Sequence, residues 1–317
     1  MSENALRVSV AIPTRDEEET IGSLIEALVS QTHPPDEIIV VDGGSRDRTV
    51  DIVNGYADRG ARVETIGPAF PGRGRNAAIR ASRNEWVALI DAGCIPLPSW
   101  LAELLAPLAL DPHLEAVFGD YRPALETEWD KAQALALVGA REPSTGLHPP
   151  AAVSALIRRA CFDRVGGFRE DLRAAEDLVF FRALDEGAVR STRAPRAVVT
   201  WRLAPGPLAA FRRLRLYSEH HIRSGLAHTW HWRVMAMDVA GVGLLAAAPF
   251  FPAVLVLLLG AVTARVVLTA YRRRTNLSDP LFLTLPLLLR VALLLFLADA
   301  AAWLGALAAA ARRVRSS

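Results

Sequence analysis

Residues 8–18 read VSVAIPTRDEE, an apolar run that becomes polar at its end. The part from Val8 to Ile12 is short and continuous, which is typical of a strand buried on both faces. Residues 37–45, EIIVVDGGS, repeat this pattern, a weaker run follows at 62–66 and another at 86–90. Segments with apolar residues at helical spacing separate the runs. This alternation predicts an α/β fold in which helices cover both faces of a mainly parallel sheet.

Three carboxylates follow the predicted strands directly. Asp16, Asp42 and Asp91 each come just after the carboxyl end of a strand. Ligands of open α/β sheets bind beyond those ends, so the sequence predicts that the three carboxylates lie along one rim of the sheet. The chain that follows is less regular, with strands expected at 116–121, 151–157 and 197–201 and helices at 176–186 and 207–225.

Composition separates a polar part from an apolar part. Hydrophobic residues make up 51% of the chain and charged residues 22%, but almost all acidic residues lie before Asp238. The formal net charge of +2, without a basic stripe interleaved with aromatic residues, argues against a nucleic-acid partner. Cys94 and Cys161 have no metal-ligand spacing and are too few for a disulfide framework. Residues 1–10 contain no signal-peptide pattern, so we expect the N-terminal domain to be cytoplasmic.

Two apolar stretches predict attachment to a membrane. Val234–Tyr271 and Pro280–Ala311 are each long enough for one crossing, since about 20 apolar residues span a bilayer. Pro249–Pro252 interrupts the first stretch, and the arginines Arg272–Arg274 lie between the two. Arginine-rich loops tend to stay cytoplasmic, so we predict a helical hairpin bent at Pro249–Pro252. Two simple spans and a buried helical core are the alternatives. We expect a catalytic domain at 1–226 and a membrane-associated helical region at 227–317.

Four local patterns occur in a fixed order, and a fifth follows much later. They are IPTRDE at 12–17, VDGGSRDRT at 41–49, GRGRN at 72–76, IDAG at 90–93, and ED at 176–177 after VGGF at 165–168. With these motifs in this order, residues 7–225 resemble the family 2 glycosyltransferases of the GT-A fold. The resemblance implies a mixed, mainly parallel sheet with flanking helices. It also implies transfer of a sugar from a nucleotide-diphospho-sugar to a hydroxyl or phosphate acceptor, with inversion of configuration.

Most of these motifs are expected to contact the nucleotide-sugar. The Asp42 carboxylate can accept a hydrogen bond from a pyrimidine ring or ribose, and the glycines after it allow a ligand to approach the backbone. A loop that only caps the next helix is the alternative for Asp42, and a solvated surface arginine is the alternative for Arg75. The residues expected to bind the nucleotide-sugar are Pro13, Thr14, Arg15, Glu17, Asp42, Gly44, Ser45, Arg75, Asn76, Asp91, Ala92, Gly93, Arg212 and Arg215.

Arg212 and Arg215 lie on the predicted basic helix that precedes the membrane region. Similar enzymes place an arginine there against the leaving diphosphate, and a guanidinium suits bidentate phosphate contacts. The alternative is that these arginines contact anionic lipid headgroups.

Asp91 is the expected metal ligand. The family usually presents Asp-x-Asp, which holds a divalent cation on the diphosphate, and here Gly93 replaces the second aspartate. Mg²⁺ or Mn²⁺ is often held by one or two carboxylates plus substrate phosphates, so Asp91 alone can serve. A turn residue without a ligand is the alternative for Asp91.

Glu176-Asp177 resembles the family's catalytic-base motif. By that pattern Asp177 is the base for the acceptor hydroxyl, and Glu176 positions the acceptor or the helix. Neighbouring side chains on a helix lie about 100° apart, so only one of the two can point into the site. An acidic helix N-terminus favoured by the macrodipole is the alternative. The turn Gly166-Gly167-Phe168 is expected to line the acceptor pocket.

Two functional hypotheses follow. The first is an inverting glycosyltransferase at the cytoplasmic face of the cell membrane, whose partners are a nucleotide-diphospho-sugar and a lipid-linked acceptor. The second is a membrane-bound nucleotide-binding scaffold or partner subunit without metal-dependent catalysis; Gly93 supports it, and Glu176-Asp177 argues against it. A nucleotidyltransferase is disfavoured because Thr14-Arg15-Asp16 stands where that chemistry usually has a glycine-rich loop with a lysine.

Overall fold

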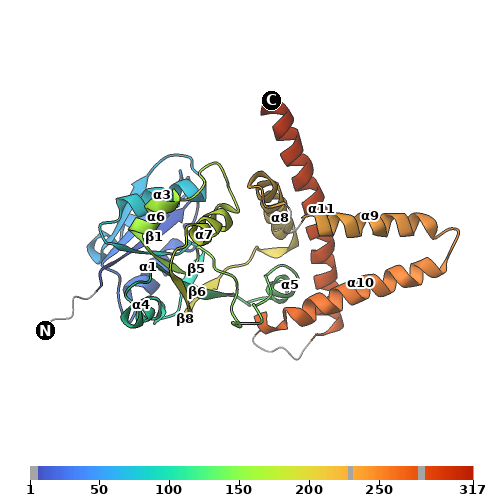
Figure 1. Cartoon of the computed structure of the whole chain (residues 1–317), viewed down its shortest axis with the longest axis horizontal. Coiled ribbons are helices and arrows are strands. Elements are labelled where there is room, and N and C mark those ends of the chain that lie inside the picture. The colour runs from blue at the N-terminus through green and yellow to red at the C-terminus, as the bar shows by residue number, and fades with distance from the viewer. Residues whose placement is uncertain (1–5, 228–230, 278–282, 317) are drawn as a thin grey trace. The chain divides into compact units, whose positions relative to one another are not determined.

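The computed structural model describes residues 6–227, 231–277 and 283–316. Contacts divide the chain into two compact units (Figure 1). The first unit consists of the residues up to Arg122 and of Leu147–Arg202, and the second of Pro123–Gly146 and the residues from Leu203 onward. The expected boundary between residues 226 and 227 separates a catalytic domain from a membrane-associated region. These are functional roles, which the two units do not test, so this boundary stays a prediction.

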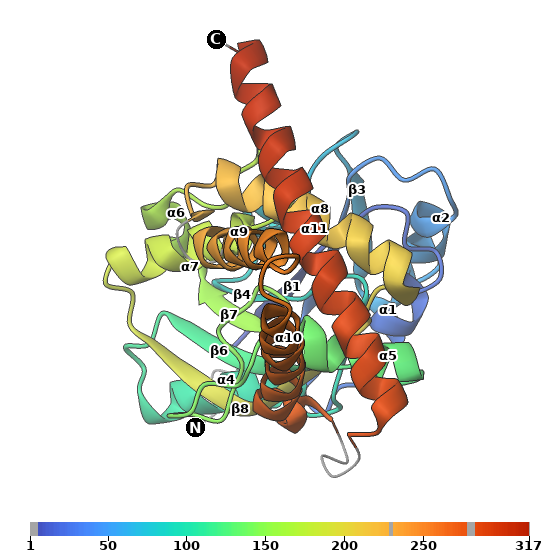
Figure 2. The same ribbon diagram turned by 90° about the vertical axis from the view of Figure 1, so that its right-hand side faces the viewer.

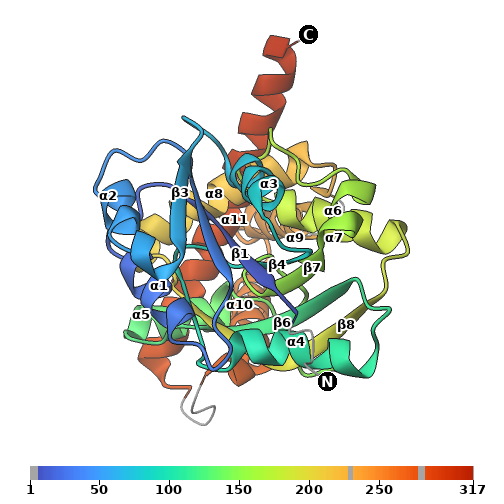
Figure 3. The same cartoon turned by 90° about the vertical axis from the view of Figure 1, so that its left-hand side faces the viewer.

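The first unit contains an eight-stranded sheet with the order β3-β2-β1-β4-β7-β6-β8-β5 (Figure 3). The pairs β3–β2, β2–β1 and β1–β4 are parallel, whereas β7 is antiparallel to both β4 and β6, and β5 to β8. The predicted mixed sheet of the GT-A type is confirmed. Its strands are β1 (Val8–Thr14), β2 (Glu37–Asp42), β3 (Ala61–Thr65), β4 (Trp86–Leu89), β5 (Cys94–Pro96), β6 (Ala116–Pro123), β7 (Ala155–Arg158) and β8 (Ser191–Trp201).

Helices cover both faces of this sheet, which explains why its central strands are apolar throughout. Val10 and Ile12 of β1 belong to one hydrophobic cluster, together with α1 and α4. Ala11, between them, belongs to the cluster on the opposite face, with α3 and α7, because successive side chains of a strand alternate between faces. The helices of this unit are α1 (Ile21–Val29), α2 (Thr49–Asn54), α3 (Pro71–Ala81), α4 (Trp100–Leu110), α6 (Arg159–Val165) and α7 (Glu176–Glu186).

The register of the parallel strands brings three loops to one edge of the sheet. Thr14 pairs with Asp42, which pairs in turn with Thr65, while Ala11 pairs with Leu89. The segments that follow β1, β2 and β4 therefore leave the sheet at the same edge, where the sequence predicts a site.

The second unit is helical, and its longest helix is α11 (Leu285–Ser316). Helix α8 (Gly206–Arg223) crosses α11 closely (Figure 2). The Ser218 hydroxyl donates a hydrogen bond of 2.9 Å to the Ala302 carbonyl. A Cβ atom on Gly305 would lie 2.4 Å from Ser218 Oγ, so this crossing requires glycine at 305. A separate apolar cluster joins α11 to α5 (Glu128–Ala136) and α10 (Ala253–Arg272).

Helices α9 (His231–Ala247) and α10 form a hairpin, and the chain reverses at residues 248–252 (Figure 1). The predicted bend at Pro249–Pro252 is confirmed, while its position in a membrane stays a prediction. In the described part of the chain, Ala253–Arg272 and Leu285–Arg313 are long and apolar enough to cross a membrane. Pro280, where the second apolar stretch was expected to begin, lies outside the described residues.

Candidate active site

A cavity of about 400 Å³ opens where β1, β2 and β4 end. The sequence motifs predict eight of its wall residues, and most of these follow the ends of apolar strands. The predicted residues on the wall are Pro13, Thr14, Arg15, Glu17, Arg75, Asp91, Ala92 and Gly93.

The loops after β1 and β2 are joined by hydrogen bonds. The backbone N–H of Asp16 donates to Ser45 Oγ, and that of Glu17 to Thr49 Oγ1, both over 2.8 Å. In return, Asp16 Oδ1 accepts a hydrogen bond of 2.8 Å from the Arg46 N–H. These bonds hold Asp16 at a φ of 54°, a left-handed conformation that few residues other than glycine adopt. The cavity wall after β1 is therefore fixed by the next loop of the chain.

Asp42 is buried at the end of β2, and its carboxylate accepts hydrogen bonds from its own loop. Its carboxylate accepts hydrogen bonds of 3.1 Å from the backbone N–H groups of Gly44 and Ser45. Gly44 has a φ of 86°, and a Cβ there would lie 3.0 Å from the Pro68 nitrogen. Asp42, Gly44 and Ser45 are not among the cavity-lining residues, so these contacts match the loop-capping alternative. Their contact with a nucleotide stays a prediction.

Asn76 is buried and clamps the turn that precedes α7. Its side-chain amide donates to the Phe168 carbonyl and its Oδ1 accepts from the Phe168 N–H, both over 2.9 Å. Gly166 ends α6 at a φ of 83°, and Gly167 has a φ of 75° with no room for a Cβ, which would lie 2.8 Å from the Phe162 ring. Phe168 is itself buried and stacks on Phe180. The three predicted acceptor residues thus form a rigid turn, and their contact with an acceptor stays a prediction.

Arg75 joins the cavity wall to helix α7. Its Nη2 lies 2.7 Å from Asp91 Oδ1, and its Nη1 lies 2.5 Å from Glu176 Oε1. The guanidinium also lies over the Phe168 ring, 5.5 Å from its centroid. Arg75 is buried rather than solvated, so the surface-arginine alternative is wrong. Burial lowers the pKa of Arg75, but the charges of Asp91, Glu176 and Asp177 outweigh it and raise that pKa above its ordinary value.

Asp177 is half-buried beside Glu176 at the start of α7. Burial and the neighbouring Glu176 charge raise the pKa of Asp177 to about 6, although the charge of Arg75 opposes this shift. Ala175, directly before the helix, has a φ of 64°, which bends the chain sharply into the first turn. Glu176 is buried and forms the ion pair with Arg75. Asp177, its neighbour in the sequence, is not part of that ion pair.

Asp91 is the only predicted metal ligand, and one of its oxygens is held by Arg75. Within the described ranges, no three His, Cys, Asp or Glu side chains gather into a metal-binding group. A Cβ on Gly93 would meet no atom within 4 Å, so the place of a second carboxylate is open space. One carboxylate fits a hard cation only if diphosphate and water supply the other ligands.

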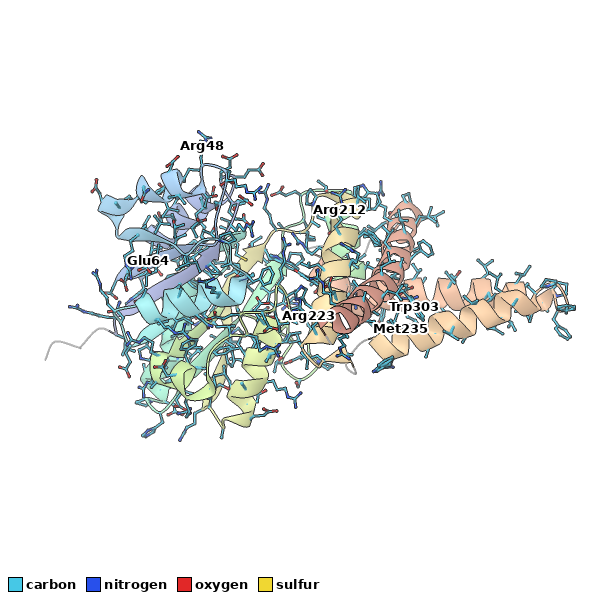
Figure 4. All side chains as sticks on the ribbon, turned by 90° about the horizontal axis from the view of Figure 1, so that it is seen from above. Arg48, Glu64, Arg212, Arg223, Met235 and Trp303 are labelled. Carbon is cyan, nitrogen blue, oxygen red and sulfur yellow. The ribbon has the colours of Figure 1, made fainter. Side chains whose placement is uncertain are left out.

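Arg212 and Arg215 lie exposed on α8 in the second unit. Figure 4 labels Arg212 and, further along the same helix, Arg223. The structure does not define the position of α8 relative to the cavity, so a contact with a diphosphate stays a prediction.

Half of the cavity wall consists of residues that no sequence motif marks as ligands. Asp16 was placed at the rim but was not assigned a contact. Arg173 lies in the turn before α7 and carries no local signal. Gly74 is required because a Cβ there would lie 3.1 Å from Pro13 Cβ. The wall residues without a predicted role are Asp16, Val41, Gly43, Ala69, Phe70, Pro71, Gly74 and Arg173.

Sequence comparison finds related proteins over the first part of the chain. Residues 9–166 match the family model described as Glycosyl transferase family 2. The chain is 33% identical over 93 residues to a poly(ribitol-phosphate) beta-glucosyltransferase of Bacillus spizizenii, an alignment of 27% of this chain and 15% of that protein. It is 33% identical over 127 residues to a glucosyl-3-phosphoglycerate synthase of Mycolicibacterium smegmatis, covering 38% and 42% respectively. The matches thus span less than half the length of these relatives.

Solved structures share the fold. A mannosyltransferase of Pyrobaculum calidifontis in complex with GDP-Man and Mn²⁺ superposes with a TM-score of 0.66 at 21% identity, over 96% of this chain and 86% of that one. TarS of S. aureus in complex with UDP-GlcNAc superposes with a TM-score of 0.54 at 18% identity, over 94% and 91%. At these identities the likeness establishes the fold and leaves substrates open.

Proposed function

Because the chain belongs to glycosyl transferase family 2, we propose that it transfers a sugar, with inversion, from a nucleoside-diphospho-sugar to a hydroxyl or phosphate acceptor. One observation carries the proposal. The cavity at the strand ends has Asp91 on its wall, and Arg75 connects Asp91 to the helix that begins Glu176-Asp177. A donor site and a candidate base are thus parts of one ion-paired cluster.

The donor is proposed to occupy the cavity. Its volume of about 400 Å³ lies in the range of small-molecule sites. Arg15 and Arg173 on the wall offer guanidinium groups suited to phosphate oxygens. Mg²⁺ or Mn²⁺ held by Asp91 and the diphosphate would neutralise charge on the leaving group. The relatives that bind GDP-Man with Mn²⁺ or UDP-GlcNAc support a nucleotide-sugar donor.

Asp177 is proposed as the general base. It accepts the proton of the acceptor hydroxyl while that oxygen attacks the anomeric carbon, and the bond from that carbon to the diphosphate breaks on the opposite side. The nucleoside diphosphate leaves with the bonding electrons. A pKa of about 6 keeps Asp177 ionised at neutral pH and still basic enough to take the proton, which is the range suited to general bases.

The acceptor is proposed to be lipid-linked and the enzyme to act at the cytoplasmic face of the cell membrane. The outward-facing apolar side chains of α10, such as Val256 at 72% exposure, suit a lipid environment better than water. The hairpin also returns Arg272 and Arg274 to the end at which α9 begins. Arginines near helix ends favour the cytoplasmic side.

A donor screen tests this function. The purified full chain is incubated with a panel of UDP-, GDP- and dTDP-sugars, with and without extracted membrane lipids, and release of nucleoside diphosphate is measured. We expect release from at least one donor, stimulated by lipid, and none from Asp177→Asn, which should still bind the free diphosphate. Binding without turnover by the wild type under every condition would favour the scaffold hypothesis.

A further inference from the structure

Arg75 contacts two parts of the site that serve different substrates. Its Nη2 binds Asp91, which follows β4 on the cavity wall, and its Nη1 binds Glu176, the first residue of α7. The two partners lie 16 and 101 residues away along the chain. Arg75 is therefore the direct ionic connection between the proposed donor cavity and the helix that carries the proposed base.

The surroundings of Arg75 leave its guanidinium little freedom. The side chain is 5% exposed, and the Phe168 ring lies against it. Asn76, the next residue of α3, holds Phe168 by two backbone hydrogen bonds. A planar guanidinium can hold two carboxylates at fixed angles, whereas a lysine ammonium acts as a point charge. The geometry thus depends on arginine at this position.

The charges around Arg75 are not balanced. Asp91, Glu176 and Asp177 all act on this one guanidinium. Glu176 Oε2 and Arg75 Nε are buried without a hydrogen-bond partner among the described atoms. Because Arg75 contacts Asp91 and Glu176 with the same guanidinium, a ligand charge placed at Asp91 would act on both contacts.

Resting on the proposed function, we propose that Arg75 is a positioning residue that couples occupancy of the donor cavity to the order of the first turn of α7, and so to the orientation of Asp177. Arg75 acts through Asp91 and Glu176. Donor binding then prepares the base for the acceptor hydroxyl. A direct phosphate ligand would need no connection to α7, so the two roles are separable.

Hydrogen exchange measures this coupling without requiring turnover. The full chain is compared with and without saturating UDP or GDP, whichever binds the wild type more tightly, and exchange is read for residues 13–17 and 173–186. We expect the nucleotide to slow exchange in both segments in the wild type and in the control Arg73→Gln, an exposed arginine of the same helix. In Arg75→Gln and in Arg75→Lys, saturating nucleotide should still slow exchange at 13–17, but slowing at 173–186 should be lost.

Kinetics provide the second readout. In Arg75→Gln we expect kcat to fall at least about 50-fold, while the dissociation constant for the diphosphate changes less than about fivefold. An undiminished response at 173–186 in Arg75→Gln, or no response there in the wild type, would overturn the coupling while leaving the proposed function intact. An affinity loss as large as the loss of kcat/KM would make Arg75 a simple donor ligand. No binding of UDP, GDP or dTDP by the wild type would overturn both proposals.

Discussion

Arg265 of α10 and Asp299 of α11 form a two-point ion pair, with Nη1–Oδ2 and Nη2–Oδ1 distances of 2.6 and 2.7 Å. Both charges lie in helices apolar enough to span a membrane. Nearby, the Trp303 indole N–H donates to Asp238 Oδ2 over 2.9 Å and links α11 to α9; Figure 4 labels Trp303 together with Met235 of α9. These contacts join the hairpin to α11 through paired polar groups, an arrangement that charges would need if these helices lie in lipid.

Breaking this pair on one side should destabilise the second unit. Arg265→Leu leaves the Asp299 carboxylate, 15% exposed, without its cation, which costs about 3 kcal/mol, the lower end for a buried pair. The double variant Arg265→Leu/Asp299→Leu removes both charges and should recover most of the loss. Thermal unfolding in detergent measures both, with the exposed Arg272→Leu as the control. Equal loss in the single and double variants would show that the charges do not act as a pair.

The pH dependence of transfer should report the ionisation of Asp177. A base works only when ionised, so kcat should be retained above the pKa of Asp177 and lost as pH falls through about 6. Arg75→Gln should move this acidic limb to higher pH, because the charge of Arg75 lowers the pKa of Asp177. The exposed Asp185→Asn on the same helix serves as the control. A limb that stays in place in Arg75→Gln would assign it to another group.

Gly93→Asp should strengthen binding of a divalent cation. A side chain at 93 meets open space, so folding should be unaffected, and the new carboxylate would complete Asp-x-Asp beside Asp91. We expect Mn²⁺ affinity in the presence of diphosphate to rise about tenfold, or ~1.4 kcal/mol. Calorimetry measures it, with Gly93→Asn as the uncharged control of equal size. Equal Mn²⁺ affinities in the two variants would mean that position 93 does not face the cation.

The hairpin predicts where its ends lie. Cys94 and Cys161, both buried, are first replaced by alanine, and a single cysteine is placed at Arg272, which is exposed. In sealed cells an impermeant maleimide should label this cysteine only after permeabilisation. A second variant, with its single cysteine at the exposed Asp58 of the first unit, is the cytoplasmic reference and should behave in the same way. Labelling of position 272 from outside intact cells would support two simple spans instead.

The strand ends and much of the cavity wall are predictable from sequence because continuous apolar runs fix buried parallel strands. Each such run then delivers its next residues to the same edge of the sheet. The role of Asp42 was harder to predict, because a carboxylate beside two glycines suits both a ligand and its own loop. In the structure the N–H groups of Gly44 and Ser45 occupy it.

Other features depend on contacts between distant segments and have no local signal. Arg75 looks like a surface arginine in its helix, and it becomes a buried ion-pair partner through Asp91 and Glu176, which lie 16 and 101 residues later in the chain. Arg173 reaches the cavity from the turn before α7, a position that no periodicity marks. Helix α4 is a different case, because Trp100, Leu104 and Leu108 recur at helical spacing and would have predicted it.

The anomeric configuration of the product distinguishes an inverting transfer from a retaining one. A donor identified by the screen is followed by proton NMR during transfer to lipid acceptor or, more slowly, to water. We predict that the first-formed product of the wild type has the anomeric configuration opposite to that of the donor, and that Asp177→Asn forms none. A product that retains the donor's configuration, or undiminished turnover in Asp177→Asn, would contradict an inverting transfer with Asp177 as its base.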